Sequence, residues 1–292
     1  MFISGYLLKY GCKIRGVSLA DIPIWGKRGI VWKKVKRLLL PYLSVSLVAF
    51  FLKYLMSSFV LRPIDFSFTG YMHMLFYPWD NVIIFFWFLP TLFLIFVIFI
   101  FFSHLCKDIS FNIYTSLVLL FLLILIHIFN PIECIEFLNM KGVVDYMFYF
   151  VLGYCSCSFN IMNTYNNLYL RSVFLIFTSL VVVFILPPFI GKDVISALIG
   201  IWLSISLGQL YIRLGFRFLN HLYGASFAIY LFSWFPQVVS QQLFLGLTHA
   251  PWQVGTVLAV LTGIYVPFCI YKFLVKYKNT FIGKYLSLLL GH

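Results

Sequence analysis

The chain has 292 residues, of which 63% are hydrophobic and only 10% are charged, and its formal net charge is +13. A soluble domain carries roughly 25% charged residues, so the composition excludes a soluble globular protein. Backbone polar groups in lipid must be satisfied internally, by helices or by a closed barrel. Barrel strands alternate apolar and polar residues, whereas here the apolar runs are continuous, as from Val82 to Phe102. We therefore expect an all-α, polytopic transmembrane helix bundle.

Eight apolar segments are predicted to be membrane spans from their length and character. A shorter apolar piece, residues 2–8, cannot cross a core about 30 Å thick and is expected to be the end of a further, partial span. Neither an internal repeat nor a long linker divides the sequence, so a single membrane domain over residues 1–292 is predicted. In chain order the spans are residues 38–61, 82–102, 114–130, 143–159, 170–190, 194–212, 222–245 and 254–272.

The Lys and Arg residues predict the orientation of these spans, because cytoplasmic segments carry an excess of them. Nine lie between residues 9 and 37. With that segment in the cytoplasm, the C-terminus is also cytoplasmic, and the outer segments hold only Arg62, Lys141 and Lys192. The basic residues lie between apolar runs rather than on a folded basic face, which argues against nucleic acid as a partner.

An aromatic stretch, residues 71–79, lies between the first two spans and is too short to cross the membrane. Tyr and Trp prefer the headgroup level, so we expect an interfacial or re-entrant segment. His73 and Asp80 on this segment are candidates for contact with a substrate or for catalysis. The alternative for both residues is an interfacial anchor.

Two ionisable residues fall within predicted spans, where such groups mark functional sites by default. His127 is a catalytic candidate, although near the outer end of its span its polar tip can simply reach water. Lys53 is predicted to lie mid-span and to face a polar cavity. Asp145 starts a span and is expected to stabilise that helix N-terminus. The six cysteines show no zinc-type spacing and are interpreted as small apolar residues of the interior.

Four stretches taken together resemble the membrane-bound acyltransferase-3 family. Residues 2–8 resemble the end of the second helix of that family. The basic sequence from Lys33 to Tyr42 resembles the approach to the third helix, which closes in Pro-Tyr. The sequence from Trp87 to Phe93 is similar to a Trp-Phe-Leu signature of the sugar O-acetylase branch. Residues 225–233 match a late helix that usually ends in His, where this chain has Ser233.

The resemblance implies transfer of an acyl group, usually acetyl, from cytoplasmic acyl-CoA to a sugar hydroxyl. The acceptor would be a surface polysaccharide or its lipid-linked precursor, and the partners would be the bilayer, acetyl-CoA and this glycan, with no metal. The predicted location is a bacterial inner membrane. Family members normally have ten helices, the first of which carries an Arg and a His thought to be central to acyl transfer. This chain is expected to lack that helix.

The resemblance also assigns roles to individual residues. Arg37, Lys36, Lys34 and Lys33 would hold the phosphates of CoA; orientation and attraction to anionic lipid are the alternative. Trp87 would lie near the acyl tunnel, or simply pack. Tyr230 and Ser233 share one helix face and would line a polar cavity, with Lys53 a further residue of this pathway. Hydrogen bonding between helices explains Tyr230 and Ser233 equally well.

Two other functions remain open from the sequence. One is a transporter or flippase for a lipid-linked sugar, although such proteins often show internal repeats. The other is an inactive relative or a non-catalytic membrane subunit. Consumption of acetyl-CoA by membranes that contain the chain would separate the enzyme from both.

Overall fold

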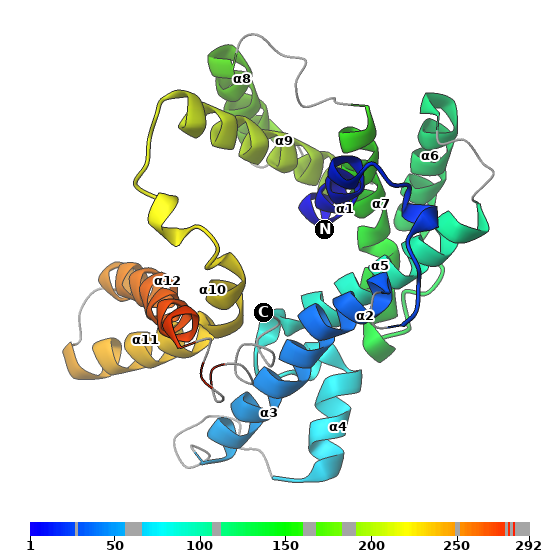
Figure 1. The fold of residues 1–292 in the computed structure, drawn as a ribbon. Coiled ribbons are helices and arrows are strands. Elements are labelled where there is room, and N and C mark those ends of the chain that lie inside the picture. The colour runs from blue at the N-terminus through cyan, green and yellow to red at the C-terminus, as the bar shows by residue number, and fades with distance from the viewer. Residues whose placement is uncertain are drawn as a thin grey trace. The chain divides into compact units, whose positions relative to one another are not determined.

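A computed structural model describes residues 1–26, 29–55, 66–106, 112–159, 168–182, 191–248, 252–277, 280 and 283. Of residues 168–170 and 243–248 only the backbone is described. Over these ranges the regular secondary structure is helical throughout (Figure 1), which confirms the predicted fold class. Arg62, one of the three basic residues predicted on the outer side, lies outside these ranges.

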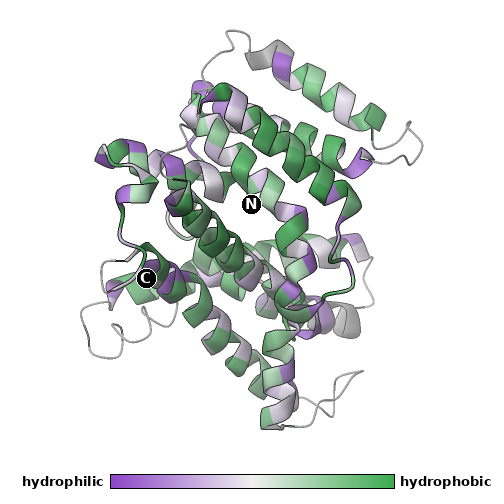
Figure 2. Ribbon diagram, turned by 90° about the vertical axis from the view of Figure 1, so that its right-hand side faces the viewer, coloured by the Kyte–Doolittle hydropathy of each residue, from purple (hydrophilic) through white to green (hydrophobic). Residues whose placement is uncertain are grey.

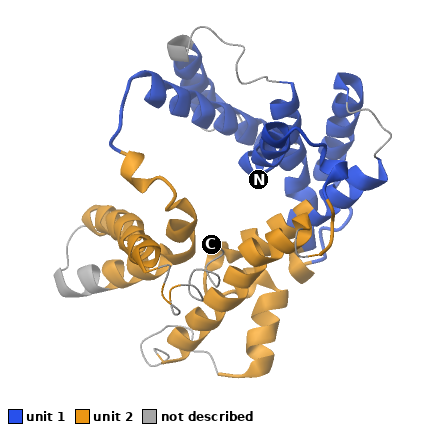
Figure 3. Ribbon diagram, in the orientation of Figure 1, with its two compact units in different colours: residues 1–22, 97–135, 140–218 blue, residues 23–96, 136–139, 219–292 orange. Residues whose placement is uncertain are grey.

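The chain divides into two compact units (Figure 3). Unit 1 comprises residues 1–22, 97–135 and 140–218, and unit 2 comprises residues 23–96, 136–139 and 219–292. Helix α5 (Phe88–Leu105) contributes to both units. The prediction of one membrane domain over the whole chain stays a prediction.

Unit 1 is built from pairs of packed helices. Helix α1 (Phe2–Arg15) packs on α7 (Met140–Ser158), and α7 also packs on α6 (Ile113–Phe129). A second pair is formed by α8 (Leu168–Leu180) and α9 (Lys192–Arg213). A short 3-10 turn, η1 (Leu19–Asp21), follows α1.

Unit 2 contains a continuous helix made of three elements, a group of packed helices near the C-terminus and several short turns. Helix α2 (Ile30–Lys34), the π-helical turn η2 (Val35–Leu39) and α3 (Leu40–Leu55) follow one another without interruption, and α3 packs on α4 (Phe68–Phe76). Helix α12 (Trp252–Lys276) packs on α10 (Ser226–Phe232) and α11 (Trp234–Thr248). The short turns are η4 (Pro78–Asp80), η5 (Ile84–Trp87), η6 (Phe137–Asn139) and η9 (Asn220–Leu222).

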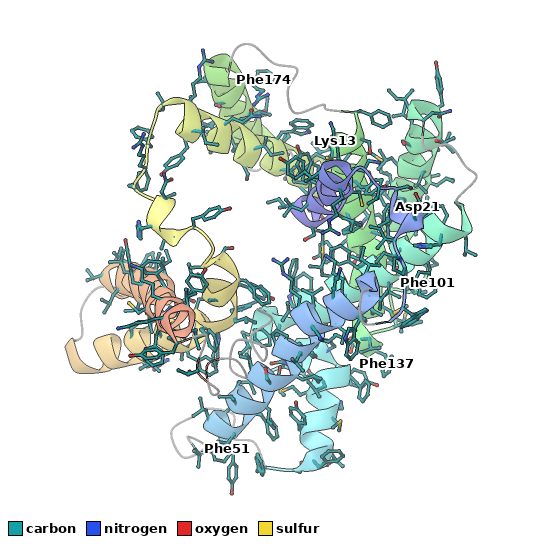
Figure 4. The ribbon with its side chains drawn as sticks, in the orientation of Figure 1. Lys13, Asp21, Phe51, Phe101, Phe137 and Phe174 are labelled. Carbon is teal, nitrogen blue, oxygen red and sulfur yellow. The ribbon has the colours of Figure 1, made fainter. Side chains whose placement is uncertain are left out.

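Apolar helix faces are exposed in both units, as expected of a surface that lipid covers. Helices coloured for hydrophobic residues dominate Figure 2. Figure 4 labels two exposed examples, Phe51 on α3 and Phe174 on α8. Among the described residues, four helices are long and apolar enough to cross a membrane: Ile30–Leu55, Ile84–Leu105, Lys192–Arg213 and Trp252–Lys276. All eight predicted spans overlie helices, but their number stays a prediction.

Two predicted spans differ from the observed helices in ways that have local causes. The helix of the first predicted span, 38–61, begins at Ile30 rather than near residue 38, since Lys and Arg favour helix and continue it before the apolar run. The predicted span 222–245 is divided between α10 and α11. Pro236 has no N–H to offer the carbonyl of Phe232 one turn earlier, so the regular hydrogen-bond ladder fails there.

The cysteines are only partly as expected. All six are free, and Cys12, Cys155 and Cys157 are buried. Cys134 and Cys269 are exposed, so the prediction that all six belong to the interior is wrong for these two. A short hydropathy window does not distinguish a loop or an outward helix face from the interior.

Candidate functional site

The basic residues assigned to CoA lie within the helix that runs from Ile30 to Leu55, not before it. Lys33, Lys36 and Arg37 are exposed, whereas Lys34 is partly buried. The Nζ of Lys34 lies 3.7 Å from the ring centroid of Phe96. Phe96 belongs to the middle of α5, an almost wholly apolar helix. Lys34 therefore reaches alongside a predicted membrane span, where a charged group normally faces the protein interior or water.

The backbone of this basic stretch is a π-helical turn. The N–H of Leu40 donates to the carbonyl of Val35, five residues back. Pro41 follows, and it has no N–H to give the carbonyl of Arg37, which is the disruption that proline introduces into a helix. Single π turns inside helices occur frequently at functional sites. Lys36 and Arg37 both lie in this widened turn.

The aromatic segment folds back along α3 through hydrogen bonds. The Tyr42 hydroxyl donates to the carbonyl of Leu75 at 3.0 Å, and the Tyr71 hydroxyl donates to the carbonyl of Leu43 at 2.9 Å. At the other end of α3, the ring centroids of Phe66 and Tyr54 lie 5.4 Å apart. Tyr54 lies twelve positions after Tyr42 on the helix, a rise of about 18 Å at 1.5 Å per residue. This return along a predicted span supports the re-entrant alternative for the aromatic segment.

His73 and Asp80 are brought together by α4 and η4. The His73 Nδ1 lies 3.6 Å from an Asp80 carboxylate oxygen, and the His73 ring stacks on Tyr77 with centroids 4.6 Å apart. Both side chains are about 60% exposed (60% and 62%). This pair is an accessible polar feature on an aromatic segment, and its predicted role in acceptor contact stays a prediction.

The residues predicted to line a tunnel are also found in unit 2. The Trp87 ring stacks on Trp79 with centroids 4.9 Å apart, and the Tyr230 hydroxyl donates to the carbonyl of Phe85 at 2.8 Å. Both Trp87 and Tyr230 contact the ring of Phe88. Trp87 and Tyr230 thus belong to one aromatic cluster, although they are 143 residues apart in the printed sequence.

The two remaining pathway candidates lie elsewhere on the helices. Ser233 is half-buried at the junction of α10 and α11. Lys53 lies in the last turn of the described part of α3 rather than at its middle. Neither position assigns a role, so the predicted contribution of both residues to a tunnel stays a prediction.

A separate cavity of about 550 Å³ lies in unit 1, at the C-terminal end of α6 and the N-terminal ends of α7 and α9. His127 lines this cavity together with Asp145. The His127 Nδ1 lies 3.0 Å from the backbone carbonyl of Asp145 and 3.6 Å from its carboxylate. Helices joined by a short connection run antiparallel and bring the end of one beside the start of the next, which places these two residues together.

The hydrogen bond to the Asp145 carbonyl fixes the tautomer of His127. A carbonyl oxygen only accepts, so Nδ1 carries the proton, and Nε2 of the neutral ring is then a hydrogen-bond acceptor. Asn130 Nδ2 donates to the Asp145 carboxylate at 2.7 Å and holds it in place. The side chains of His127 and Asp145 are 18% and 24% exposed, so water reaches both.

The sequence prediction for Asp145 is wrong. Helix α7 begins at Met140 and has no acidic residue in its first turn, so Asp145 lies too far along the helix to stabilise its N-terminus. The sequence missed the contact with His127 because the partners are 18 residues apart on different helices. The sequence carried one signal for this contact: a polar residue lies late in one apolar run, and another lies early in the next.

An ion pair lies at the edge of the same cavity. The Lys141 ammonium donates to Glu133 at 3.0 Å, and this hydrogen bond raises the pKa of Lys141, so the ammonium stays charged. Asp193, in the first turn of α9, also lines the cavity. Among the described residues, no group of three His, Cys, Asp or Glu side chains is arranged to hold a metal ion.

A family model described as the acyltransferase domain matches residues 1–272. The chain belongs to the membrane acyltransferase-3 family. The match covers the basic stretch, the Trp87 signature and the late helix of Tyr230, so the resemblance seen in the sequence is confirmed. Neither a curated protein nor a solved structure matches the chain. The protein is thus a membrane-embedded acyltransferase that requires an acyl donor.

Proposed function

We propose that the chain transfers an acetyl group from cytoplasmic acetyl-CoA to a sugar hydroxyl of a surface polysaccharide or its lipid-linked precursor, in a bacterial inner membrane. Family membership gives acyl transfer. The identity of the donor rests on the basic stretch of the helix Ile30–Leu55, and the identity of the acceptor rests on the sugar O-acetylase likeness of the Trp87 signature.

The position of the basic stretch is the observation that carries the donor assignment. Cations that only orient a span lie at the membrane surface. Lys34 instead lies against the middle of α5, while Lys33, Lys36 and Arg37 remain exposed on the same helix. A group of cations alongside a span is costly unless it serves an anionic ligand or a polar passage. Arg suits phosphate particularly well because its planar guanidinium donates bidentately.

The donor assignment predicts the behaviour of an Arg37→Gln variant. A hydrogen bond to a charged group contributes about 1.5–3 kcal/mol, so loss of the Arg37 contact should raise the KM for acetyl-CoA about tenfold or more. The KM for the acceptor should stay within about twofold. The measurement is release of free thiol by membranes that contain the chain, with acetyl-CoA and an added glycan acceptor.

Arg15→Gln is the matched control for this experiment. Arg15 is exposed, carries the same charge and lies at the end of α1, predicted on the same side of the membrane. If Arg15→Gln raises the KM for acetyl-CoA as much as Arg37→Gln, the basic residues act only through general charge. If neither variant changes it, Arg37 does not bind the donor.

A further inference from the structure

The cavity in unit 1 has the wrong charge for the acyl donor. Three carboxylates line it, from Glu133, Asp145 and Asp193, against the single ammonium of Lys141. A negative excess repels the phosphates of CoA, because like charges in a partly enclosed site disfavour each other. The basic stretch of unit 2 has the opposite character. The chain therefore offers two polar regions that suit two different ligands.

The polar groups of the cavity suit hydroxyl groups. In the neutral imidazole, His127 Nε2 is an acceptor, since Nδ1 donates its proton to the Asp145 carbonyl. The carboxylates also accept hydrogen bonds, and a hydroxyl is a donor that carries no charge. A ligand with several hydroxyls can donate to His127 and to Asp193 at once. These partners differ from a metal site, which would need three or more ligating side chains around one point.

The size and apolar lining of the cavity are those of a small-ligand site. Such sites enclose roughly 300–1,000 Å³ and combine aromatic surface with a few placed polar groups. This cavity measures about 550 Å³ and is lined by the rings of Tyr146 and Tyr149. Tyr149 is buried with Phe148 and Val194 in the core of unit 1. The polar groups of the cavity therefore lie next to the packed core that α7 and α9 form.

We propose that this cavity binds the polyhydroxylated acceptor, with His127 Nε2 accepting a hydrogen bond from one acceptor hydroxyl and Asp193 from another. This inference rests on the proposed function and adds the location and chemistry of its acceptor site. Glu133, Asp145 and Asp193 lie close to or within the segments predicted on the outer side of the membrane. The site is therefore expected on the side where surface glycans are found.

The test follows the chemical reactivity of His127 in the full chain purified in detergent. Diethyl pyrocarbonate acylates an unprotonated imidazole nitrogen, and peptide mass spectrometry gives the rate for each histidine. The probe is a mixture of the methyl glycosides of glucose, galactose, mannose and rhamnose. We expect the mixture to slow the reaction of His127 at least threefold. His221, which is exposed, stacks on Tyr265 and does not line the cavity, should react at an unchanged rate.

Coenzyme A is the second probe. Because the cavity carries a negative excess, coenzyme A should leave the rate at His127 unchanged. Protection of His127 by coenzyme A would overturn the inference, and so would equal rates with and without the glycosides. Protection of both histidines would indicate a general solvent effect and would also overturn it.

Matched variants test the charged partner of the acceptor. Asp193→Asn removes the charge at the cavity, and we expect the glycoside concentration for half-protection of His127 to rise about tenfold. Glu136→Gln removes an exposed carboxylate that does not line the cavity and should leave this concentration unchanged. An equal response of the two variants would contradict the assignment. A Tm in detergent equal to that of the unaltered chain shows that a variant is folded.

The outcome separates this inference from the proposed function. Protection of His127 by glycosides, without any acetyl transfer from acetyl-CoA, would retain the cavity as a polyol site and remove the proposed reaction. Acetyl transfer to glycosides without protection of His127 would retain the reaction and remove the cavity from it.

Discussion

At the scale of single residues, a buried polar network holds the aromatic cluster of unit 2. Asn139 is 1% exposed and has a positive φ of 53°, a conformation that Asn tolerates better than most residues. Its side chain donates to the Thr91 hydroxyl at 2.7 Å and accepts from Trp79 Nε1 at 3.0 Å. Thr91 in turn donates to the carbonyl of Trp87 at 2.6 Å. Asn139 thereby connects the two stacked tryptophans.

Replacement of Asn139 by Ala should destabilise the protein. The change removes the hydrogen bond to the buried Thr91 hydroxyl and the hydrogen bond from the exposed Trp79, at a cost of about 1–3 kcal/mol. Thermal unfolding in detergent, followed by tryptophan fluorescence, should show a lower Tm. Asn220→Ala, at an exposed position, is the control and should leave Tm nearly unchanged. Equal Tm values for the two variants would show that the network contributes little.

The sequence predicted single residues less well than helices. It identified His127 and the pair of His73 and Asp80 as polar groups in unusual places. It gave Asp145 the wrong role, because pairing between helices depends on rotation about each helix axis. An apolar run that has no polar face does not indicate which side of the helix faces its neighbour, so it does not specify the rotation about the helix axis. Which residues of the candidate site face each other therefore required the structure.

At the scale of elements, the contact between α1 and α7 depends on two glycines. A Cβ at Gly5 would overlap the carbonyl oxygen of Phe150, and a Cβ at Gly153 would overlap that of Phe2. The backbones of the two helices thus touch, as small residues allow at helix contacts in membranes. This contact fixes α1, although hydropathy alone left residues 2–8 as an incomplete span.

Gly153→Ala should separate these helices. Overpacking costs about 1–3 kcal/mol, and we expect a lower Tm in detergent. Gly11→Ala is the control on the same helix pair, because nothing lies within 4 Å of the added Cβ. Since Ala favours helix over Gly by about 1 kcal/mol, Gly11→Ala should raise Tm or leave it unchanged. A Gly153→Ala protein as stable as the unaltered chain would argue against the close contact.

Hydropathy predicted where helices occur but not where they begin or break. The length of an apolar run in the sequence indicates how much of a helix is in contact with lipid. It does not report a helical extension of Lys and Arg residues such as the one from Ile30 to Arg37. The division at Pro236 was readable from the residue itself, whereas the return of α4 along α3 rests on the Tyr42 and Tyr71 hydrogen bonds. These long-range contacts produce no periodic pattern in the sequence, so the sequence alone did not predict them.

At the scale of the whole molecule, the distribution of cations predicts a definite orientation in the membrane. Cys134 is exposed in the connection between α6 and α7, a segment predicted on the outer side. A membrane-impermeant maleimide added to intact cells should label Cys134, and Cys134→Ser should abolish this labelling. Cys12 and Cys155 are buried and should not react. Labelling that requires permeabilised cells would reverse the predicted orientation.

Composition and motifs predicted the class of the molecule because both are properties of the entire chain. A low share of charged residues requires lipid contact, and the motifs in order indicated the family. The division into two compact units was not visible, because no linker or change in composition separates them. The segments of unit 1 and unit 2 alternate along the chain, so sequence position does not reveal unit membership.

The central claim is that this membrane protein moves an acetyl group from acetyl-CoA to a glycan hydroxyl. The most direct measurement supplies acetyl-labelled acetyl-CoA to the cytoplasmic face of inverted membrane vesicles, with and without the chain. We predict label on the glycan as an alkali-labile ester only in vesicles that contain the chain, and less label at limiting acetyl-CoA with Arg37→Gln. Glycan without ester-linked label, while acetyl-CoA remains intact, would contradict the account.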